Sequence, residues 1–74
     1  METDIEEILR IMRAENFLWA YEHDLYGVVE FEGSRTMVGK ETIREMLDKG
    51  LIEIDLKLSV YREEGDNLCY RIKV

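Results

Sequence analysis

The first apolar residues of the chain recur with the period of an amphipathic helix. At positions i, i+3, i+4 and i+7 they are Ile5, Ile8, Leu9 and Met12. Thr3 and Glu6 have the spacing of a capping box, and Glu6 precedes Arg10 by four residues, which favours an ion pair along the helix. The pattern predicts a helix that stops near Asn16, with Ile11 at the margin of the core or exposed.

From Phe17 onward the apolar period changes to two, which is typical of a strand. One face of this segment carries Phe17, Trp19 and Tyr21, and the other carries Leu18 and Ala20. A strand that is apolar on both faces is covered on both sides, by the domain itself or by a partner. Residues 22–24, Glu-His-Asp, then predict a polar turn.

A second strand pattern occupies residues 25–32, and Gly33-Ser34 has the composition of a two-residue hairpin turn. That turn would pair Glu32 with Arg35, which sets opposite charges face to face. The same register groups three apolar residues on one surface, namely Val29, Phe31 and Val38. We therefore expect an antiparallel hairpin with an apolar surface that faces the core.

The segment from Lys40 to Lys49 returns to the helical period. Its predicted buried stripe consists of Ile43, Met46 and Leu47. Gly50 supplies the left-handed residue that commonly ends a helix. We expect a second helix that ends at this glycine.

The last part of the chain alternates strongly between apolar and polar residues. Its apolar positions are Ile52, Ile54, Leu56, Leu58 and Val60, followed after a break by Leu68, Tyr70, Ile72 and Val74. A three-residue turn at residues 63–65 would give Gly65 a positive φ and pair Val60 with Leu68. The pattern predicts a long hairpin.

Together the elements predict an α+β fold, an antiparallel sheet of four to five strands with two helices in the order α-β-β-β-α-β-β. The 74 residues, 46% of them apolar, are expected to form one small domain over residues 1–74. A domain of this size buries only about 60% of the surface of its unfolded chain, so self-association into a homodimer is an open alternative. Because no apolar run approaches the roughly 18–20 residues that cross a bilayer, we expect no membrane partner.

Charge is distributed unevenly along the chain. The sequence has 17 acidic and 10 basic side chains and a formal net charge of −7. Residues 1–32 contain nine acids against Arg10 and Arg13, whereas acids and bases balance in residues 33–74. The early acids either solubilise the surface and stabilise a helix N-terminus, or form an anionic face that is matched to a basic partner.

Catalytic and metal chemistry have few candidates in this sequence. His23 and Cys69 are the sole residues of their kinds, whereas a zinc site needs three or four ligands. A nucleophilic Cys69 would need a base beside it. Glu30 and Glu32 are the best carboxylate pair, yet acid–base catalysis needs apolar surroundings or close like charges. We expect no enzyme, no metal and no cofactor, and a lone thiol suits a reducing cytoplasm.

The run from Met46 to Ile52, Met-Leu-Asp-Lys-Gly-Leu-Ile, resembles the junction between the recognition helix and the wing of winged-helix proteins. The resemblance covers residues 38–74 and implies a winged-helix-like C-terminal half. It further implies a DNA-binding transcription regulator that acts as a dimer. The helix at residues 40–49 would then enter the major groove, and the tip at residues 62–66 would touch the backbone.

The charges of those two segments favour a protein partner over nucleic acid. The predicted helix carries Lys40, Arg44 and Lys49 beside Glu41, Glu45 and Asp48, and the tip carries Glu63, Glu64 and Asp66. DNA binding draws much of its affinity from cations that neutralise phosphates. DNA binding is therefore the second hypothesis.

Aromatic residues are concentrated in the anionic part of the chain, and Trp and Tyr are enriched at interface hot spots. We expect a non-enzymatic protein-binding module, an inhibitor or adaptor of the type that phages and mobile elements encode. It would present an anionic face to a basic protein, for example one that normally grips nucleic acid. The candidate protein-binding residues are Trp19, Tyr21, Glu22, Asp24, Tyr26, Glu30 and Glu32.

Overall fold

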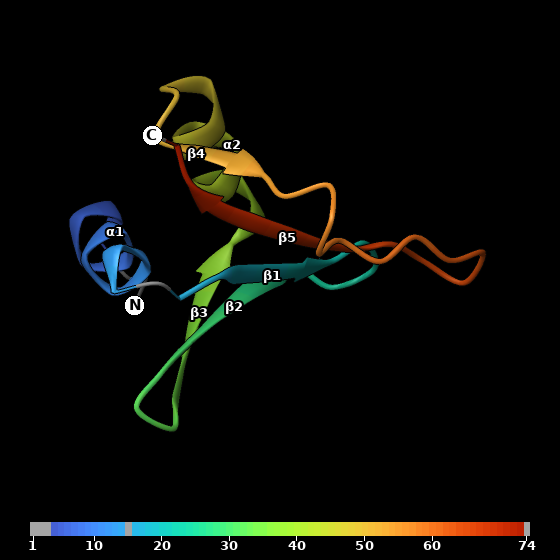
Figure 1. Cartoon of the computed structure of the whole chain (residues 1–74), viewed down its shortest axis with the longest axis horizontal. Coiled ribbons are helices and arrows are strands. Elements are labelled where there is room, and N and C mark those ends of the chain that lie inside the picture. Colours follow the sequence, from blue (N-terminus) through green and yellow to red (C-terminus); the bar gives the residue numbers. More distant parts are fainter. Residues whose placement is uncertain (1–3, 15, 74) are drawn as a thin grey trace.

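The computed structural model describes residues 4–14 and 16–73 of the chain. Within these residues it forms two helices and five strands in the order α-β-β-β-α-β-β (Figure 1), which confirms the predicted α+β fold. The elements are α1 (Ile5–Arg13), β1 (Leu18–Tyr21), β2 (Tyr26–Phe31), β3 (Ser34–Gly39), α2 (Lys40–Asp48), β4 (Ile52–Ile54) and β5 (Asn67–Ile72).

The five strands form one antiparallel sheet in the order β3-β2-β1-β5-β4, with β1 at its centre. Successive side chains of a strand point to opposite faces, so the register sorts the residues into two sets. One set is buried and belongs to the same core as the helices, and we call it the helix face. Its fully or nearly buried residues are Leu18, Ala20, Val29, Val38, Ile52 and Tyr70.

The two helices complete the core with two differences from the predicted stripes. Ile11, expected at the core margin or exposed, is only 4% exposed, because α1 packs against both β2 and β5 and so buries a wide arc. Leu47 was expected to be buried but is 37% exposed. It lies in the last turn of α2, whose buried residues are Ile43 and Met46.

The ends of α1 use polar groups other than the predicted ones. Thr3 lies outside the described residues, and the helix is capped by Asp4, whose carboxylate accepts a hydrogen bond from the Glu6 backbone N–H at 3.4 Å. The expected pairing of Arg10 with Glu6 is wrong, because Arg10 contacts Glu7 one residue closer. Asn16 does close the helix, since its Nδ2 donates to the Ile11 carbonyl at 2.9 Å.

The β2–β3 hairpin turns one residue earlier than predicted. Glu32 and Gly33 have φ values of 51° and 80°, the conformation of a type I′ turn, whose twist suits a two-residue hairpin. Arg35 therefore lies opposite Glu30 rather than Glu32. Because the shift moves each pairing by an even number of residues, the predicted grouping of apolar residues survives: Val29, Phe31 and Val38 share the helix face.

The end of α2 follows the prediction. Gly50 has a φ of 69°, and its N–H donates to the Leu47 carbonyl at 3.0 Å. The Leu51 N–H donates to the Met46 carbonyl at 2.9 Å, which completes the paired bonds of a Schellman motif. The chain leaves this motif directly into β4.

The predicted long strand after Gly50 is wrong beyond Ile54. Residues 56–58 form a turn, and β5 pairs with β4 in a shifted register in which Ile54 lies opposite Tyr70. Val60 rejoins the sheet only through an isolated bridge to Asn67, not to Leu68. The turn interrupts the strand because the Asp55 carboxylate accepts hydrogen bonds from the backbone N–H groups of Lys57 and Leu58. The distal part of the connection between β4 and β5, around the turn at residues 63–64, projects from the sheet (Figure 1).

Candidate functional site

Strands β1, β2 and β3 place a set of side chains on the side of the sheet opposite the helices. Trp19 lies opposite Val28, and Val28 lies opposite Met37, so these three residues form a row across the strands. Residues at alternate positions along each strand share this side. We define the open face as Phe17, Trp19, Tyr26, Val28, Glu30, Arg35 and Met37.

Three apolar residues of the open face are exposed to solvent, and Trp19 and Val28 between them are half-buried. The exposed fraction is 38% for Phe17, 46% for Tyr26 and 53% for Met37, whereas Leu18 on the helix face is fully buried. Two shallow hollows, of about 420 and 430 Å³, meet at Val28. The open face therefore has accessible apolar area and two shallow hollows into which side chains of a partner could fit.

Charged residues stand at both ends of the open face. Toward the β2–β3 turn, Arg35 Nε donates to Glu30 Oε1 at 3.1 Å. At the other end Asp24 and His23 line the second hollow, and His23 Nε2 lies 3.7 Å from Glu22 Oε2. An apolar centre with a polar rim is the usual composition of a protein–protein interface.

Tyr21 shares this side of β1, but its hydroxyl is engaged within the protein. Its Oη donates to the Glu64 carbonyl at 3.0 Å, and its ring meets His23 edge-on at a centroid distance of 5.5 Å. Gly65, with a φ of 143°, packs directly against both side chains, where a Cβ would lie within 3 Å of them. Tyr21 thus holds the β4–β5 connection against the end of β1.

The predicted acids do not form a single group. Glu22 and Asp24 lie in the turn after β1, whereas Glu30 and Glu32 lie at the far end of β2, roughly 20 Å away at the rise of a strand. The acids of α1 lie on the helix side of the sheet. Among the described early carboxylates, those of residues 22–32 therefore stand at the two ends of the open face, those of α1 lie on the other side of the sheet, and the expected single anionic face is not formed.

Of the predicted residues, the open face brings together Trp19, Tyr26 and Glu30. The sequence analysis missed its other members: Phe17, Val28, Arg35 and Met37. A signal for them existed, because the odd positions of residues 17–21 and the even positions of residues 26–30 would share a face in a β1–β2 hairpin. The predicted β2–β3 register also places Arg35 and Met37 on the face of Glu30, because the observed register differs from it by an even number of residues.

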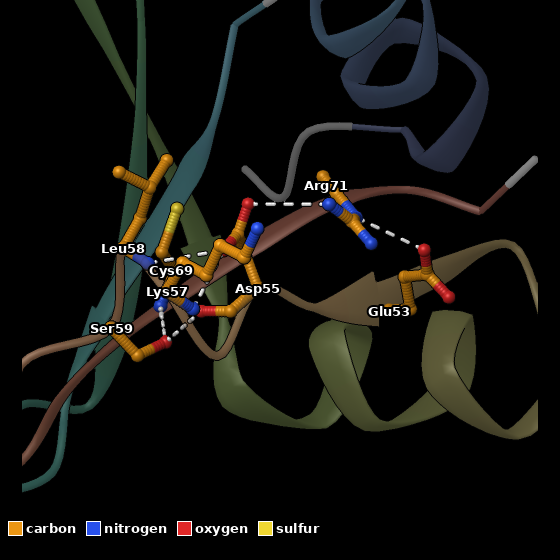
Figure 2. Close-up of polar contacts among 7 residues, drawn as sticks. All are labelled: Glu53, Asp55, Lys57, Leu58, Ser59, Cys69 and Arg71. Carbon is orange, nitrogen blue, oxygen red and sulfur yellow. Dashed lines mark hydrogen bonds and ion pairs between the residues drawn. The ribbon is translucent and has the colours of Figure 1, made fainter.

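On the same side of the sheet, the region around Cys69 is covered by the chain itself (Figure 2). Asp55 donates its backbone N–H to the Cys69 carbonyl at 2.7 Å, and its Oδ1 accepts from the backbone N–H groups of Lys57 and Leu58 at 2.9 and 3.0 Å. The Ser59 hydroxyl donates to the Asp55 carbonyl at 2.7 Å and accepts from the Cys69 N–H at 2.9 Å. These bonds replace the strand ladder that the turn interrupts.

The Cys69 thiol is inert in this setting. The side chain is fully buried, and burial, helped by the nearby Asp55 carboxylate, raises the pKa of the thiol to about 11 against the opposing effect of Arg71. A thiol with such a pKa is not a nucleophile near neutral pH. Arg71 itself bridges Asp55 at 3.4 Å and Glu53 at 3.0 Å, which fixes the covered region to β4.

Other kinds of site find little support in residues 4–14 and 16–73. Within that part of the chain, His, Cys, Asp and Glu side chains form no group of three that could hold a metal ion. Neither helix of the same residues has the length and apolar character that crossing a membrane requires. Models of known protein families, curated proteins and solved structures all fail to match the chain. The case for a function therefore rests on the open face.

Proposed function

We propose that this chain is a non-enzymatic protein-binding module, an inhibitor or adaptor, and that its partner docks on the open face. The observation that carries the proposal is the exposure of Phe17, Tyr26 and Met37 on one side of a sheet whose other side packs against the two helices. Removing such apolar area from water favours association, and the adjacent Trp19 belongs to the residue type most enriched at hot spots.

The acidic ends favour a partner with basic groups on both sides of an apolar centre. Glu30 is already paired with Arg35 at 3.1 Å, whereas Glu22 has a longer contact to His23 at 3.7 Å, so Glu22, Asp24 and Glu32 are the carboxylates more available to a partner. Opposite charges at a rim mainly speed association and select the partner. A cytoplasmic protein that grips nucleic acid presents such cations, which suits an inhibitor of the phage or mobile-element type.

The test begins with affinity capture of the partner and then measures its binding to the purified chain. Trp19 is the single tryptophan of the sequence and lies on the open face, so its fluorescence reports occupation of that face. The triple variant Glu22→Lys, Asp24→Lys and Glu32→Lys should slow association at least tenfold and flatten its dependence on salt.

A second triple variant controls for net charge. Glu6→Lys, Glu63→Lys and Glu64→Lys changes the charge by the same amount at exposed positions outside the open face. Association of this control should stay within about threefold of the unmodified chain. If both triple variants slow association equally, total charge is responsible and the electrostatic role of the open face is refuted.

The alternative proposal is a dimeric, winged-helix-like DNA-binding regulator. It is favoured by one feature, the passage from α2 through Gly50 into a hairpin whose connection projects from the sheet (Figure 1). The cations of α2 are partly engaged, since Lys40 Nζ donates to the Tyr21 carbonyl at 2.7 Å and Lys49 pairs with Glu45 at 3.6 Å. Titration with mixed-sequence duplex DNA at low salt decides, because micromolar binding that weakens with salt would support this alternative.

A further inference from the structure

The two edges of the sheet differ in how well they are protected. β4 has three residues, and the turn that starts at Asp55 ends it. β3 has six residues in an uninterrupted ladder, and the chain contains no proline. Short or broken strands resist pairing with another chain, whereas a long regular edge does not. β3 is therefore the unprotected edge.

The ladder determines which backbone groups of β3 face that edge. The Lys40 N–H donates to the Leu25 carbonyl at 3.2 Å, so even-numbered residues of this segment bond to β2. Bonding alternates along an antiparallel pair, which turns the N–H and C=O groups of Arg35 and Met37 away from β2. Gly39 is the N-cap of α2, where the carbonyl group begins the helical bonds. Arg35 and Met37 thus carry two free donors and two free acceptors.

These four groups are complementary to themselves. A two-fold axis at Thr36 sets Arg35 of one copy opposite Met37 of a second, antiparallel copy. Each such pair exchanges two hydrogen bonds, so every free group of both residues is satisfied. The stem of Arg35 then covers Met37, which is 53% exposed in a single copy. Arg35 keeps its ion pair with Glu30, and no like charges lie directly opposite each other.

We infer that the chain forms a two-fold symmetric homodimer by antiparallel pairing of β3, centred on Thr36, which joins two sheets into one of ten strands. We take the occupant of this edge to be a second copy because pairing about Thr36 satisfies all four free groups in one register and sets compatible side chains, Arg35 and Met37, opposite each other. Residues directly opposite each other share a face, so both open faces lie on the same side of the dimer. The inference rests on the backbone groups of β3 and does not require the function proposed above, although the pairing covers part of Met37 on each open face.

Sedimentation equilibrium of the purified chain, combined with amide hydrogen exchange by NMR, tests the dimer. A monomer–dimer equilibrium is expected, and exchange of the Arg35 and Met37 amides should slow at least tenfold as the dimer forms. The amides of Ile52 and Ile54, on the other edge, should not change. A chain that stays monomeric at millimolar concentration, or a dimer that leaves Arg35 and Met37 unprotected, would overturn the inference.

Two charge variants at one position test the register. Met37→Lys places a cation opposite Arg35 of the second copy, whereas Met37→Glu places an anion there. Both change the same side chain, which is 53% exposed, so neither variant should disturb the core of the single chain. The dimer dissociation constant should be at least tenfold larger for Met37→Lys than for Met37→Glu. Equal constants, or the reverse order, would contradict pairing about Thr36.

Discussion

The side of the sheet opposite the helices has two regions that differ in solvent exposure: one is covered by the chain and the other is accessible. Around Cys69 the chain folds a turn against the sheet, and the thiol, Asp55 and Ser59 are all buried. Around Val28 no comparable segment of the described residues lies over the sheet, and Phe17 and Met37 remain exposed. The chain therefore covers one apolar region with its own residues and leaves the neighbouring one accessible.

The difference teaches that exposure of the open face is not a consequence of small size alone. A turn of five residues, held by one carboxylate and one hydroxyl, suffices to cover Cys69. The β2–β3 turn, by contrast, is the shortest regular hairpin connection and leaves Val28 and Met37 uncovered.

The largest loss in the free energy of unfolding is expected from truncating a buried side chain of the helix face. Leu18→Ala removes a fully buried side chain from the helix face and should lower the free energy of unfolding by ~3–4 kcal/mol. Met37→Ala, on the open face, should cost less than about 1 kcal/mol. Urea denaturation of both variants checks the contrast, and similar losses would show that the open face is also packed.

The covered region should depend on Asp55. Asp55→Ala leaves two backbone N–H groups without their acceptor, removes one of the two carboxylate partners of Arg71 and should cost ~2–3 kcal/mol. It should also expose Cys69 to thiol reagents in the folded protein. Glu53→Ala is the matched control, because Glu53 also pairs with Arg71 but is more exposed, and it should cost under about 1 kcal/mol. Equal losses would contradict the role of the turn.

The buried thiol should make stability fall at alkaline pH. The pKa of Cys69 is raised from 9.0 to about 11, so the folded state disfavours the thiolate that the unfolded chain forms. The contribution of the neutral thiol to the free energy of unfolding is fully present below pH 9. It is lost as the pH rises toward 11, by up to ~2–3 kcal/mol. Burial, with a smaller effect from Tyr61, raises the pKa of Tyr70 as well, so Tyr70 also makes stability fall at alkaline pH. In Cys69→Ala the loss should shrink, and an unchanged slope in urea denaturation against pH would contradict this account.

Much of the fold could be read from the sequence because its signals are local. The apolar period placed both helices, and Gly50 ended the second one where a left-handed residue is needed. The alternation of Leu68, Tyr70 and Ile72 likewise indicated β5. These signals depend on neighbours within a few residues, so they survive without knowledge of the whole fold.

The remaining features depend on competition between interactions. Leu56 and Leu58 continue a strand pattern. The Asp55 carboxylate, however, accepts hydrogen bonds from the Lys57 and Leu58 backbone N–H groups, and these bonds form a turn in place of the strand ladder. The β2–β3 register depends on Glu32, which adopts a positive φ in the turn. Positive φ is uncommon for residues other than glycine, so the sequence favoured a turn that begins at Gly33. The division of the acids between two ends of β2 needed the complete sheet order, so the sequence could suggest an anionic face but not its layout.

The most direct test removes apolar area from the open face without touching the helix face or the β3 edge. The double variant Phe17→Ser and Tyr26→Ser should lower the free energy of unfolding by only ~1–2 kcal/mol, because the two side chains are 38% and 46% exposed. Its affinity for the captured partner, followed by Trp19 fluorescence, should nevertheless fall at least thirtyfold. Leu47→Ser, an equally exposed position on α2, should bind normally. Unchanged affinity of the double variant would contradict a binding role for the open face.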